Sequence, residues 1–321
     1  MPVYLVTGVA GFIGSNIALE LVRRGAEVRG FDNFETGKQE NLVDLKEKIL
    51  FREFSLLDSP ALQEFCHGVD YIFHEAAIPS VPRSVIEPVS SHNANVTGTL
   101  NLLMAARNAE VKRIVYAASS SAYGDQPVLP KREDMPPDPI SPYAVQKLAG
   151  EHYLRSFSRV YGLETVSLRY FNVFGPRQDP SSQYSGVLAK FIANMLTGKQ
   201  CTIFGDGEQS RDFTYVDNVV NANLLVCSAS AGKVSGRTFN VASGNRYSLN
   251  QTFSILKSII GYSGQPQYAE TRAGDVRDSL ADISQLHAAV GYVPSVGFEE
   301  GLQRTVTWYK DNLTRSLANA R

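Results

Sequence analysis

VYLVTGVAGFIGSN, residues 3–16, joins a short apolar run to a glycine-rich turn and then to the start of a helical pattern. Gly8, Gly11 and Gly14 lie between the two elements. Glycine at these places allows a tight turn and lets backbone N–H groups approach a pyrophosphate, and the N-terminus of the following helix favours that anion. A glycine triplet alone is common, but a strand before it and a helix after it are the context that this function requires. The stretch therefore predicts a dinucleotide-binding loop.

The next apolar run, EVRGFD at residues 27–32, ends in Asp32, 18 residues after Gly14. A carboxylate at the end of the second strand accepts hydrogen bonds from an adenosine ribose diol and repels a 2′-phosphate. The alternative is a turn that carries a solvated aspartate. Together with the glycine loop, Asp32 favours NAD over NADP as the cofactor.

Short apolar runs alternate with helical patterns along the first half of the chain. The runs are nearly continuous in apolar residues, as expected for strands that are covered on both faces. This alternation predicts an α/β fold, a Rossmann doubly wound parallel sheet. The predicted strands are 3–8, 27–32, 49–55, 69–77, 111–120 and 163–175, and helical patterns between them include 12–25, 95–110 and 142–162.

The composition of the sequence changes after about residue 171. There, loops rich in proline, glycine and polar residues separate segments with weaker helix or strand patterns. A helical pattern at 214–230 and a strand at 236–243 follow, and then a largely helical tail. We predict an NAD-binding Rossmann domain of residues 1–170 plus about 215–242. A smaller, interleaved C-terminal substrate domain would comprise about 171–214 and 243–315.

Composition excludes several classes of function. The chain has 321 residues, 43% of them hydrophobic, and a net charge of −1, so there is no basic field for nucleic acid or for a membrane surface. No apolar run reaches membrane-spanning length and the N-terminus has no signal-peptide pattern, so we expect a cytoplasmic protein. The three cysteines and five histidines show no metal-ligand spacing, and no metal is expected.

A second motif, SPYAVQK at residues 141–147, carries acid–base chemistry. Tyr143 and Lys147 share one face of a helix, and a lysine ammonium beside a tyrosine favours the phenolate, a competent base toward an alcohol. Ser119 ends a predicted strand 24 residues before Tyr143, at the edge of the sheet that faces the ligand crevice. Tyr143 alone could be an aromatic packed on the core, but the glycine loop and Ser119 together favour a catalytic role.

These motifs resemble those of the extended short-chain dehydrogenase/reductase superfamily, and within it the nucleotide-sugar epimerases and dehydratases. The resemblance covers essentially the whole chain and is strongest to the UDP-N-acetylglucosamine 4-epimerase branch. The supporting stretches are TGVAGFIGSN (7–16), HEAA (74–77), NVTGT (95–99), SSSAYG (119–124), SPYAVQK (141–147), RYFNVFGPRQ (169–178), SRDFTYVDN (210–218) and RAGDVRDSLAD (272–282).

The resemblance implies roles at the cofactor. Ser119 and Tyr143 would be catalytic, with Tyr143 as the base, and Lys147 would be its electrostatic partner and a ribose ligand. One position departs from the family, because Ser55 stands where many relatives carry an aspartate that contacts adenine. The residues expected to bind NAD are Gly8, Gly11, Phe12, Ile13, Gly14, Asp32, Asn33, Gly37, Leu56, Ala76, Ala77, Asn95, Tyr143 and Lys147.

The resemblance also implies a UDP-sugar substrate. Asn172, Arg211 and Arg272 would contact its diphosphate, because guanidinium forks pair with phosphate oxygens; surface ion pairing is the alternative for the two arginines. Phe204 would be either a wall for uracil or a core residue. The full set expected at the substrate is Arg83, Ser119, Ser120, Ser121, Tyr143, Asn172, Phe204, Arg211, Arg272 and Ser279. A homodimer is implied by the same resemblance.

The serine triplet bears on the reaction. Relatives that act as dehydratases carry acidic residues where this chain has Ser120 and Ser121, so elimination is disfavoured and epimerisation at C4 is favoured. Ser279 stands where relatives restricted to glucose and galactose often carry an aromatic residue, and a small side chain there leaves room for an N-acetyl group; it could also merely pack in a wall. We therefore expect interconversion of UDP-GlcNAc and UDP-GalNAc, with UDP-glucose and UDP-galactose as a further pair.

Two alternatives stay open. A UDP-glucuronate 4-epimerase or decarboxylase of the same family would need a cation near C6 of the sugar, and Arg83 could supply it. A non-catalytic NAD-sensing protein is the other, but such proteins usually lack the tyrosine and lysine pair that is present here.

Overall fold

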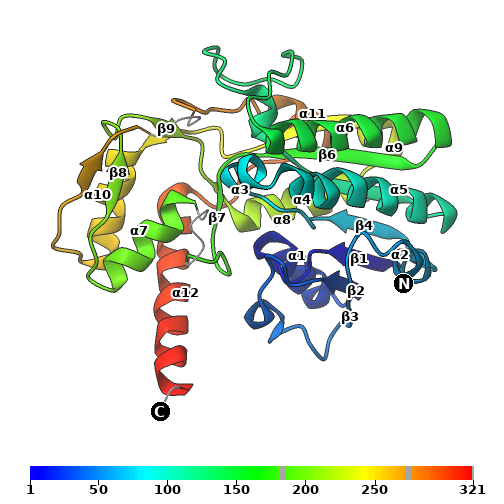
Figure 1. Ribbon diagram of the computed structural model, residues 1–321, viewed down its shortest axis with the longest axis horizontal. Helices are drawn as coiled ribbons and strands as arrows, with labels where there is room; N and C mark the ends of the chain where they lie inside the picture. The colour runs from blue at the N-terminus through cyan, green and yellow to red at the C-terminus, as the bar shows by residue number, and fades with distance from the viewer. Residues whose placement is uncertain (181–185, 272–275, 320–321) are drawn as a thin grey trace.

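A seven-stranded parallel sheet forms the centre of the computed structural model, which describes residues 1–180, 186–271 and 276–319 (Figure 1). The strand order is β11-β6-β5-β4-β1-β2-β3. The predicted Rossmann fold is thus confirmed, since the order runs outward from β1 in both directions. The strands are β1 (Val3–Thr7), β2 (Glu27–Asp32), β3 (Leu50–Glu53), β4 (Tyr71–His74), β5 (Arg113–Ser119), β6 (Glu164–Tyr170) and β11 (Arg237–Val241).

Helices cover both faces of this sheet because neighbouring residues in each strand point to opposite sides. Val115 of β5 belongs to the core cluster that contains α1 and α8, whereas Ile114 belongs to the cluster of α2, α5 and α6. The helices that pack on the sheet are α1 (Phe12–Arg23), α8 (Val216–Ser228), α2 (Ser59–Cys66), α5 (Gly98–Asn108) and α6 (Pro142–Tyr161). Shorter segments follow several strands: η1 (Gln39–Leu42), α3 (Val81–Ile86), α4 (Pro88–His92), η2 (Asn93–Thr97), η3 (Ser120–Tyr123), α9 (Ala231–Val234) and α11 (Ser284–Val290).

The strand expected over residues 163–175 is two strands. β6 ends at Tyr170, and β7 (Val173–Phe174) pairs with β10 (Thr214–Tyr215) outside the main sheet. Asn172 separates them with a φ of +35°, a conformation that interrupts an extended chain. The break turns the chain away from the sheet toward the second region of the molecule.

That second region lies beside the sheet, at the left of Figure 1, and the chain then returns to the sheet for α8 and β11. Two further small sheets help to build it, β12 with β9 and β13 with β8. The division into a cofactor domain and a substrate domain stays a prediction. The elements are α7 (Val187–Leu196), β8 (Thr202–Phe204), β9 (Ser210–Arg211), β12 (Tyr247–Ser248), α10 (Leu249–Ile260), β13 (Gln267–Ala269) and α12 (Phe298–Asn319).

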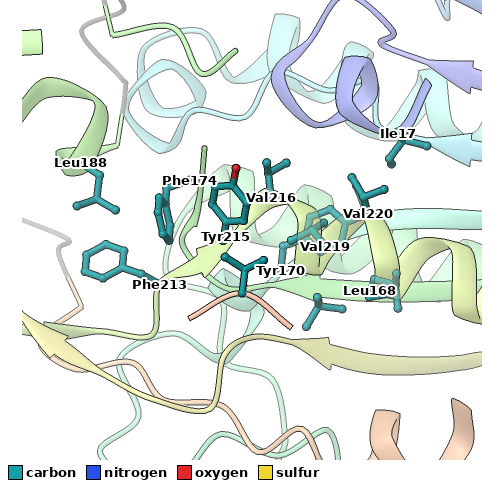
Figure 2. Packing of buried hydrophobic residues seen from close by; sticks show 14 of the residues in the cluster. Ile17, Leu168, Tyr170, Phe174, Leu188, Phe213, Tyr215, Val216, Val219 and Val220 are labelled. Atoms are coloured by element: carbon teal, nitrogen blue, oxygen red, sulfur yellow. The ribbon is translucent and has the colours of Figure 1, made fainter. Parts of the chain in front are cut away.

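One buried cluster joins the two regions, as Figure 2 shows. It runs from Ile17 of α1 through Val219 of α8 to Phe174 and Phe213, and reaches Leu188 of α7. The ring centroids of Phe174 and Phe213 lie 6.4 Å apart in an edge-to-face arrangement, which favours a fixed packing. The second region is therefore packed against the Rossmann sheet by a shared core.

Two further observations concern membrane-spanning helices and the cysteines. Within residues 1–180, 186–271 and 276–319, no helix is both long enough and apolar enough to cross a bilayer. Cys66, Cys201 and Cys227 are buried and unpaired, as their wide spacing suggests.

Candidate active site

A cavity of about 1110 Å³ lies where β1, β2, β4, β5 and β6 end. The carboxyl ends of strands in such a sheet are the usual place for a ligand. Asn95 is the exception among the predicted cofactor residues, since it does not line the wall. Those that do are Gly8, Gly11, Phe12, Ile13, Gly14, Asp32, Asn33, Gly37, Leu56, Ala76, Ala77, Tyr143 and Lys147.

The glycine loop at the start of α1 has no room for side chains. Gly8 has a φ of +65°, and a Cβ on it would lie 2.7 Å from the Cα of Ala76. A Cβ on Gly14 would lie 2.3 Å from the carbonyl oxygen of Gly8. Gly11, the N-cap of α1, offers no side-chain cap, so the first backbone N–H groups of the helix are left for an anion. The loop fits the pyrophosphate of a dinucleotide.

Asp32 ends β2 as a buried carboxylate. It accepts hydrogen bonds from the backbone N–H groups of Ala10 at 3.0 Å and Phe34 at 2.8 Å. Burial raises the pKa of this carboxyl and the backbone donors oppose that rise. Two oxygens offer about four acceptor positions, so the group can still accept from a ribose diol. Its charge and place fit NAD.

The predicted catalytic residues meet on one wall of the cavity. Ser119 ends β5, and α6 brings Tyr143 and Lys147 to the same wall one turn apart. α6 starts where it does because the Ser141 side chain accepts from the N–H of Ala144, with proline at the first helical position.

Burial disfavours both the phenolate form of Tyr143 and the ammonium form of Lys147. It raises the pKa of Tyr143 to about 12, and a hydrogen bond with Ser119 partly offsets the rise. It lowers the pKa of Lys147 to about 8, against the opposing charges of Glu75 and Glu151. The Lys147 ammonium donates to the carbonyl oxygen of Ala117 at 2.8 Å.

The other two serines of the triplet sit behind Ser119. Ser121 donates its hydroxyl to the Ser119 Oγ at 2.8 Å, and its backbone N–H does so at 3.2 Å. Of the three, Ser119 lines the large cavity, whereas Ser120 and Ser121 are not on the described wall. Ser121 thus orients Ser119, and the expected contact of Ser120 and Ser121 with substrate stays a prediction.

A second cavity of about 470 Å³ adjoins the first, because Asn172, Val173 and Gln178 line both. Phe204 of β8 and Arg211 of β9 line this smaller space, so three predicted substrate residues share it. The Arg211 Nη1 also donates to the carbonyl oxygens of Ser210 and Arg277, each at 2.9 Å. Arg272 lies outside the described residues.

Two predicted substrate residues, Ser279 and Arg83, have partners within the protein. Ser279 lines neither cavity, and its Oγ accepts from the Asn172 amide at 3.0 Å. Arg83 lines the large cavity, but its guanidinium pairs with Glu35 at 2.5 Å and with Glu87 at 3.3 Å.

Asn95 acts from behind the wall. Its side-chain oxygen accepts from the N–H of Ile78 at 2.8 Å, and its amide donates to Gln146 at 2.9 Å. It therefore fixes a cavity-lining backbone segment rather than facing the cavity.

Two acidic residues, one on the wall of the large cavity and one buried next to Arg211, are not among those predicted from the sequence. Glu75 lines the large cavity and accepts from the Tyr170 hydroxyl at 2.9 Å. Asp212 is fully buried and accepts from Ser243, Gly244 and Ala281, which ties three segments of the substrate side together; burial raises the pKa of its carboxyl to about 6. A carboxylate that follows directly on a buried strand is the signal that could have flagged Glu75.

Comparison with known proteins agrees with this geometry. The NAD dependent epimerase/dehydratase family matches residues 4–242. The chain is 36% identical to the UDP-glucuronate 4-epimerase of Thermodesulfobacterium geofontis, over 98% of each chain.

Two solved structures are close in fold. The UDP-glucose 4-epimerase of Thermotoga maritima with UDP-glucose has a TM-score of 0.92 and 41% identity, covering 97% of this chain and 99% of that one. The UDP-N-acetylglucosamine 4-epimerase of Methanobrevibacter ruminantium M1, in complex with UDP-N-acetylmuramic acid, has a TM-score of 0.91 and 40% identity, with the same coverage. The resemblance inferred from the motifs is thereby confirmed, and this chain belongs to the NAD dependent epimerase/dehydratase family of enzymes, with NAD as its cofactor.

Proposed function

We propose that this enzyme is a UDP-sugar 4-epimerase that interconverts UDP-GlcNAc and UDP-GalNAc, with UDP-glucose and UDP-galactose as a further substrate pair. The observation that carries the proposal is that the two cavities adjoin each other. A cavity with Ser119, Tyr143 and Lys147 on its wall adjoins a smaller one with Phe204 and Arg211. The first suits NAD and a sugar, and the second suits a nucleoside diphosphate.

The mechanism assigns a task to each residue at the reacting carbon. Tyr143, as the phenolate, takes the proton of the C4 hydroxyl, and Ser119 donates a hydrogen bond to that oxygen. The glycine loop and Asp32 would hold NAD, which would supply a hydride acceptor and donor at C4. Arg211 and Asn172 hold the diphosphate while the 4-keto sugar turns its other face, and Tyr143 then gives the proton back. Because the hydride that leaves C4 is returned to C4, the reaction consumes no cofactor.

Elimination of water is not part of the proposal. Ser120 and Ser121 stand where dehydratases carry acidic groups, and neither provides a carboxyl. Glu75 does bring a carboxyl to the cavity wall, but Tyr170 holds it by a hydrogen bond.

The choice of the N-acetylated sugar rests on Ser279. The side chain is small and lies against Asn172, which lines both cavities. A similar structure carries the name UDP-N-acetylglucosamine 4-epimerase, although one named for UDP-glucose is equally similar. We expect Ser279→Tyr to displace the Asn172 side chain and so to narrow the space for an acetamide.

Substrate profiling tests the function. The purified enzyme is incubated separately with UDP-GlcNAc, UDP-glucose and UDP-glucuronate, and the products are followed by proton NMR and mass spectrometry. We expect UDP-GalNAc to form at the highest kcat/KM, with no change of mass, and Ser279→Tyr to lose this activity while keeping that on UDP-glucose. Undiminished N-acetyl turnover in Ser279→Tyr contradicts the assignment of the sugar.

The same experiment addresses the uronate alternative. The cation considered for it, Arg83, is engaged by Glu35 and Glu87, which weakens its case as the partner of a C6 carboxylate. Preferred turnover of UDP-glucuronate, or release of carbon dioxide from it, would replace the proposed substrate.

We further propose a cytoplasmic homodimer. α5 and α6 carry exposed apolar side chains, among them Met104, Val145 and Tyr153, which suit a helical interface between two copies. The three unpaired thiols suit a reducing compartment. Sedimentation should give twice the 35.2 kDa of one chain, and Tyr153→Glu should return it to one chain.

A further inference from the structure

Glu75 lies in the cavity wall next to the catalytic pair, yet the mechanism above does not use it. It follows β4 directly and shares the wall with Tyr143 and Lys147. The Tyr170 hydroxyl, from the end of β6, donates to the Glu75 Oε1 at 2.9 Å. Asn223 of α8 donates in turn to that hydroxyl at 2.8 Å. Two other elements therefore hold the carboxylate in a fixed place.

Lys147 needs a counter-charge because it is buried. Its Nζ donates to the Ala117 carbonyl at 2.8 Å, a bond that fixes the group without adding charge. A desolvated ammonium without an opposite charge gives up its proton. Two carboxylates lie near Lys147. His74 pairs with Tyr116 in the sheet, so Glu75 is level with Ala117, whose carbonyl binds Lys147. Glu151 follows Lys147 by one turn of α6, and the charges of both carboxylates oppose the fall of the Lys147 pKa.

The two carboxylates differ in how they are compensated. Glu151 accepts two hydrogen bonds from the Arg169 guanidinium, from Nε at 2.9 Å and from Nη2 at 2.8 Å, so its charge is already paired with a cation. Among the described residues no ion pair joins Glu75 to a cation. Burial raises the pKa of Glu75 to about 7, and Tyr170 and Lys147 oppose the rise. The other titratable groups around Lys147 are Tyr143 on α6, Tyr116 on β5, whose ring lies 4.9 Å from Nζ, and His74 on β4, whose pKa burial lowers to about 3.

We infer that Glu75 is a positioning residue whose carboxylate keeps Lys147 in the ammonium form, and through Lys147 supports the Tyr143 phenolate. The inference rests on the proposed function, because it gives Glu75 a part in the same reaction. Glu75 touches neither the C4 oxygen nor its proton in the proposed reaction. It acts only through the charge that it places beside Lys147.

The sign of the effect follows from the charges. Activity requires the ammonium form of Lys147, so it falls as the pH rises through the pKa of that group. Glu75→Gln removes the negative charge but keeps the shape and the acceptor for Tyr170. The Lys147 pKa should drop by roughly one unit, and the fall in kcat should move to lower pH by the same amount. Glu75→Asp keeps the charge and should restore most of the wild-type profile.

Two measurements on the NAD-loaded enzyme test this. The first follows the carbon-13 shift of the lysine Cε atoms against pH in the wild type, Glu75→Gln and Glu75→Asp, with the Lys147 signal assigned through Lys147→Arg. The second is the pH profile of kcat. Glu64→Gln, an exposed carboxylate on α2, is the matched control and should change neither.

The outcomes separate the inference from the function. A lower Lys147 midpoint in Glu75→Gln, with recovery in Glu75→Asp, supports the role of Glu75. An unchanged midpoint in Glu75→Gln overturns it, even where turnover is normal. If Glu75→Gln lowers the Lys147 midpoint but the wild-type enzyme epimerises none of the UDP-sugars, the electrostatic role of Glu75 stands and the proposed function is wrong.

Discussion

The two cavities of this enzyme are built in different ways. The walls of the larger one come from the ends of β1, β2, β4, β5 and β6, whose parallel registers fix every residue relative to its neighbours. The smaller one is walled by α7 and by short strands whose partners lie far away in the chain, such as β9 with β12. We therefore expect cofactor binding and catalysis to depend on the sheet, and substrate choice to depend on a few long-range pairings. Changes in the first should alter kcat or NAD content, and changes in the second should alter KM.

The largest effect is expected at the catalytic wall. Tyr143→Phe removes the proton acceptor, and kcat should fall by about 10²–10⁴-fold, the usual contribution of a positioned base. The NAD content, read from absorbance after denaturation, should not change. Tyr161→Phe, an exposed tyrosine on the same helix, is the control and should keep full activity. Normal turnover by Tyr143→Phe would show that another group is the base.

The glycine loop gives the next effect. Gly8→Ala puts a Cβ 2.7 Å from Ala76 and should weaken NAD retention by about tenfold or more, or roughly 1.4 kcal/mol. Gly25→Ala is the matched control, because Gly25 has a similar φ of +75° but no atom within 4 Å of the added carbon. Both variants carry the backbone strain, so equal loss of NAD in both would mean that strain, and not the close approach at Ala76, explains the glycine.

A substrate-side change should act on KM instead. Arg211→Ala removes a cation from the smaller cavity, and KM for the UDP-sugar should rise by roughly tenfold, as expected when a charged hydrogen bond is lost. Arg211→Lys should recover part of the affinity, and kcat and NAD content should stay close to wild type in both. A fall in kcat alone would place Arg211 with the catalytic wall and break the comparison.

The smallest effect is expected inside the serine triplet. Ser121→Ala removes a donor that orients Ser119, and kcat should fall by a few-fold, in line with about 1 kcal/mol for one hydrogen bond. Ser120→Ala should be neutral, because that side chain makes no described contact at the wall. Equal losses in both would mean that Ser120 also contacts the sugar.

How far the sequence could predict the molecule follows the same division. The sheet, the glycine loop, Asp32 and the Tyr143–Lys147 pair were predictable because periodicity and short motifs report on local structure. The break at Asn172 was not, since a positive φ at asparagine has no distinct pattern.

Long-range contacts were the other obstacle. The bond from Asn172 to Ser279 joins residues 107 positions apart, and the Arg83–Glu35 pair joins residues 48 apart. Spacing along the chain carries no sign of such partners. For the same reason the bond of Ser279 to Asn172 and the role of Asp212 were not predicted, and the contact of Ser279 with the sugar stays a prediction.

The central claim is that a hydride leaves C4 of the sugar and returns to the same carbon. The most direct measurement starts from UDP-GlcNAc that carries deuterium at C4 and follows the product by NMR and mass spectrometry in ordinary water. We expect UDP-GalNAc that retains the deuterium at C4, since the hydride never exchanges with solvent. Loss of the deuterium to water would contradict the return of the hydride to C4. Failure to form a C4 epimer from every one of the UDP-sugars would contradict it as well.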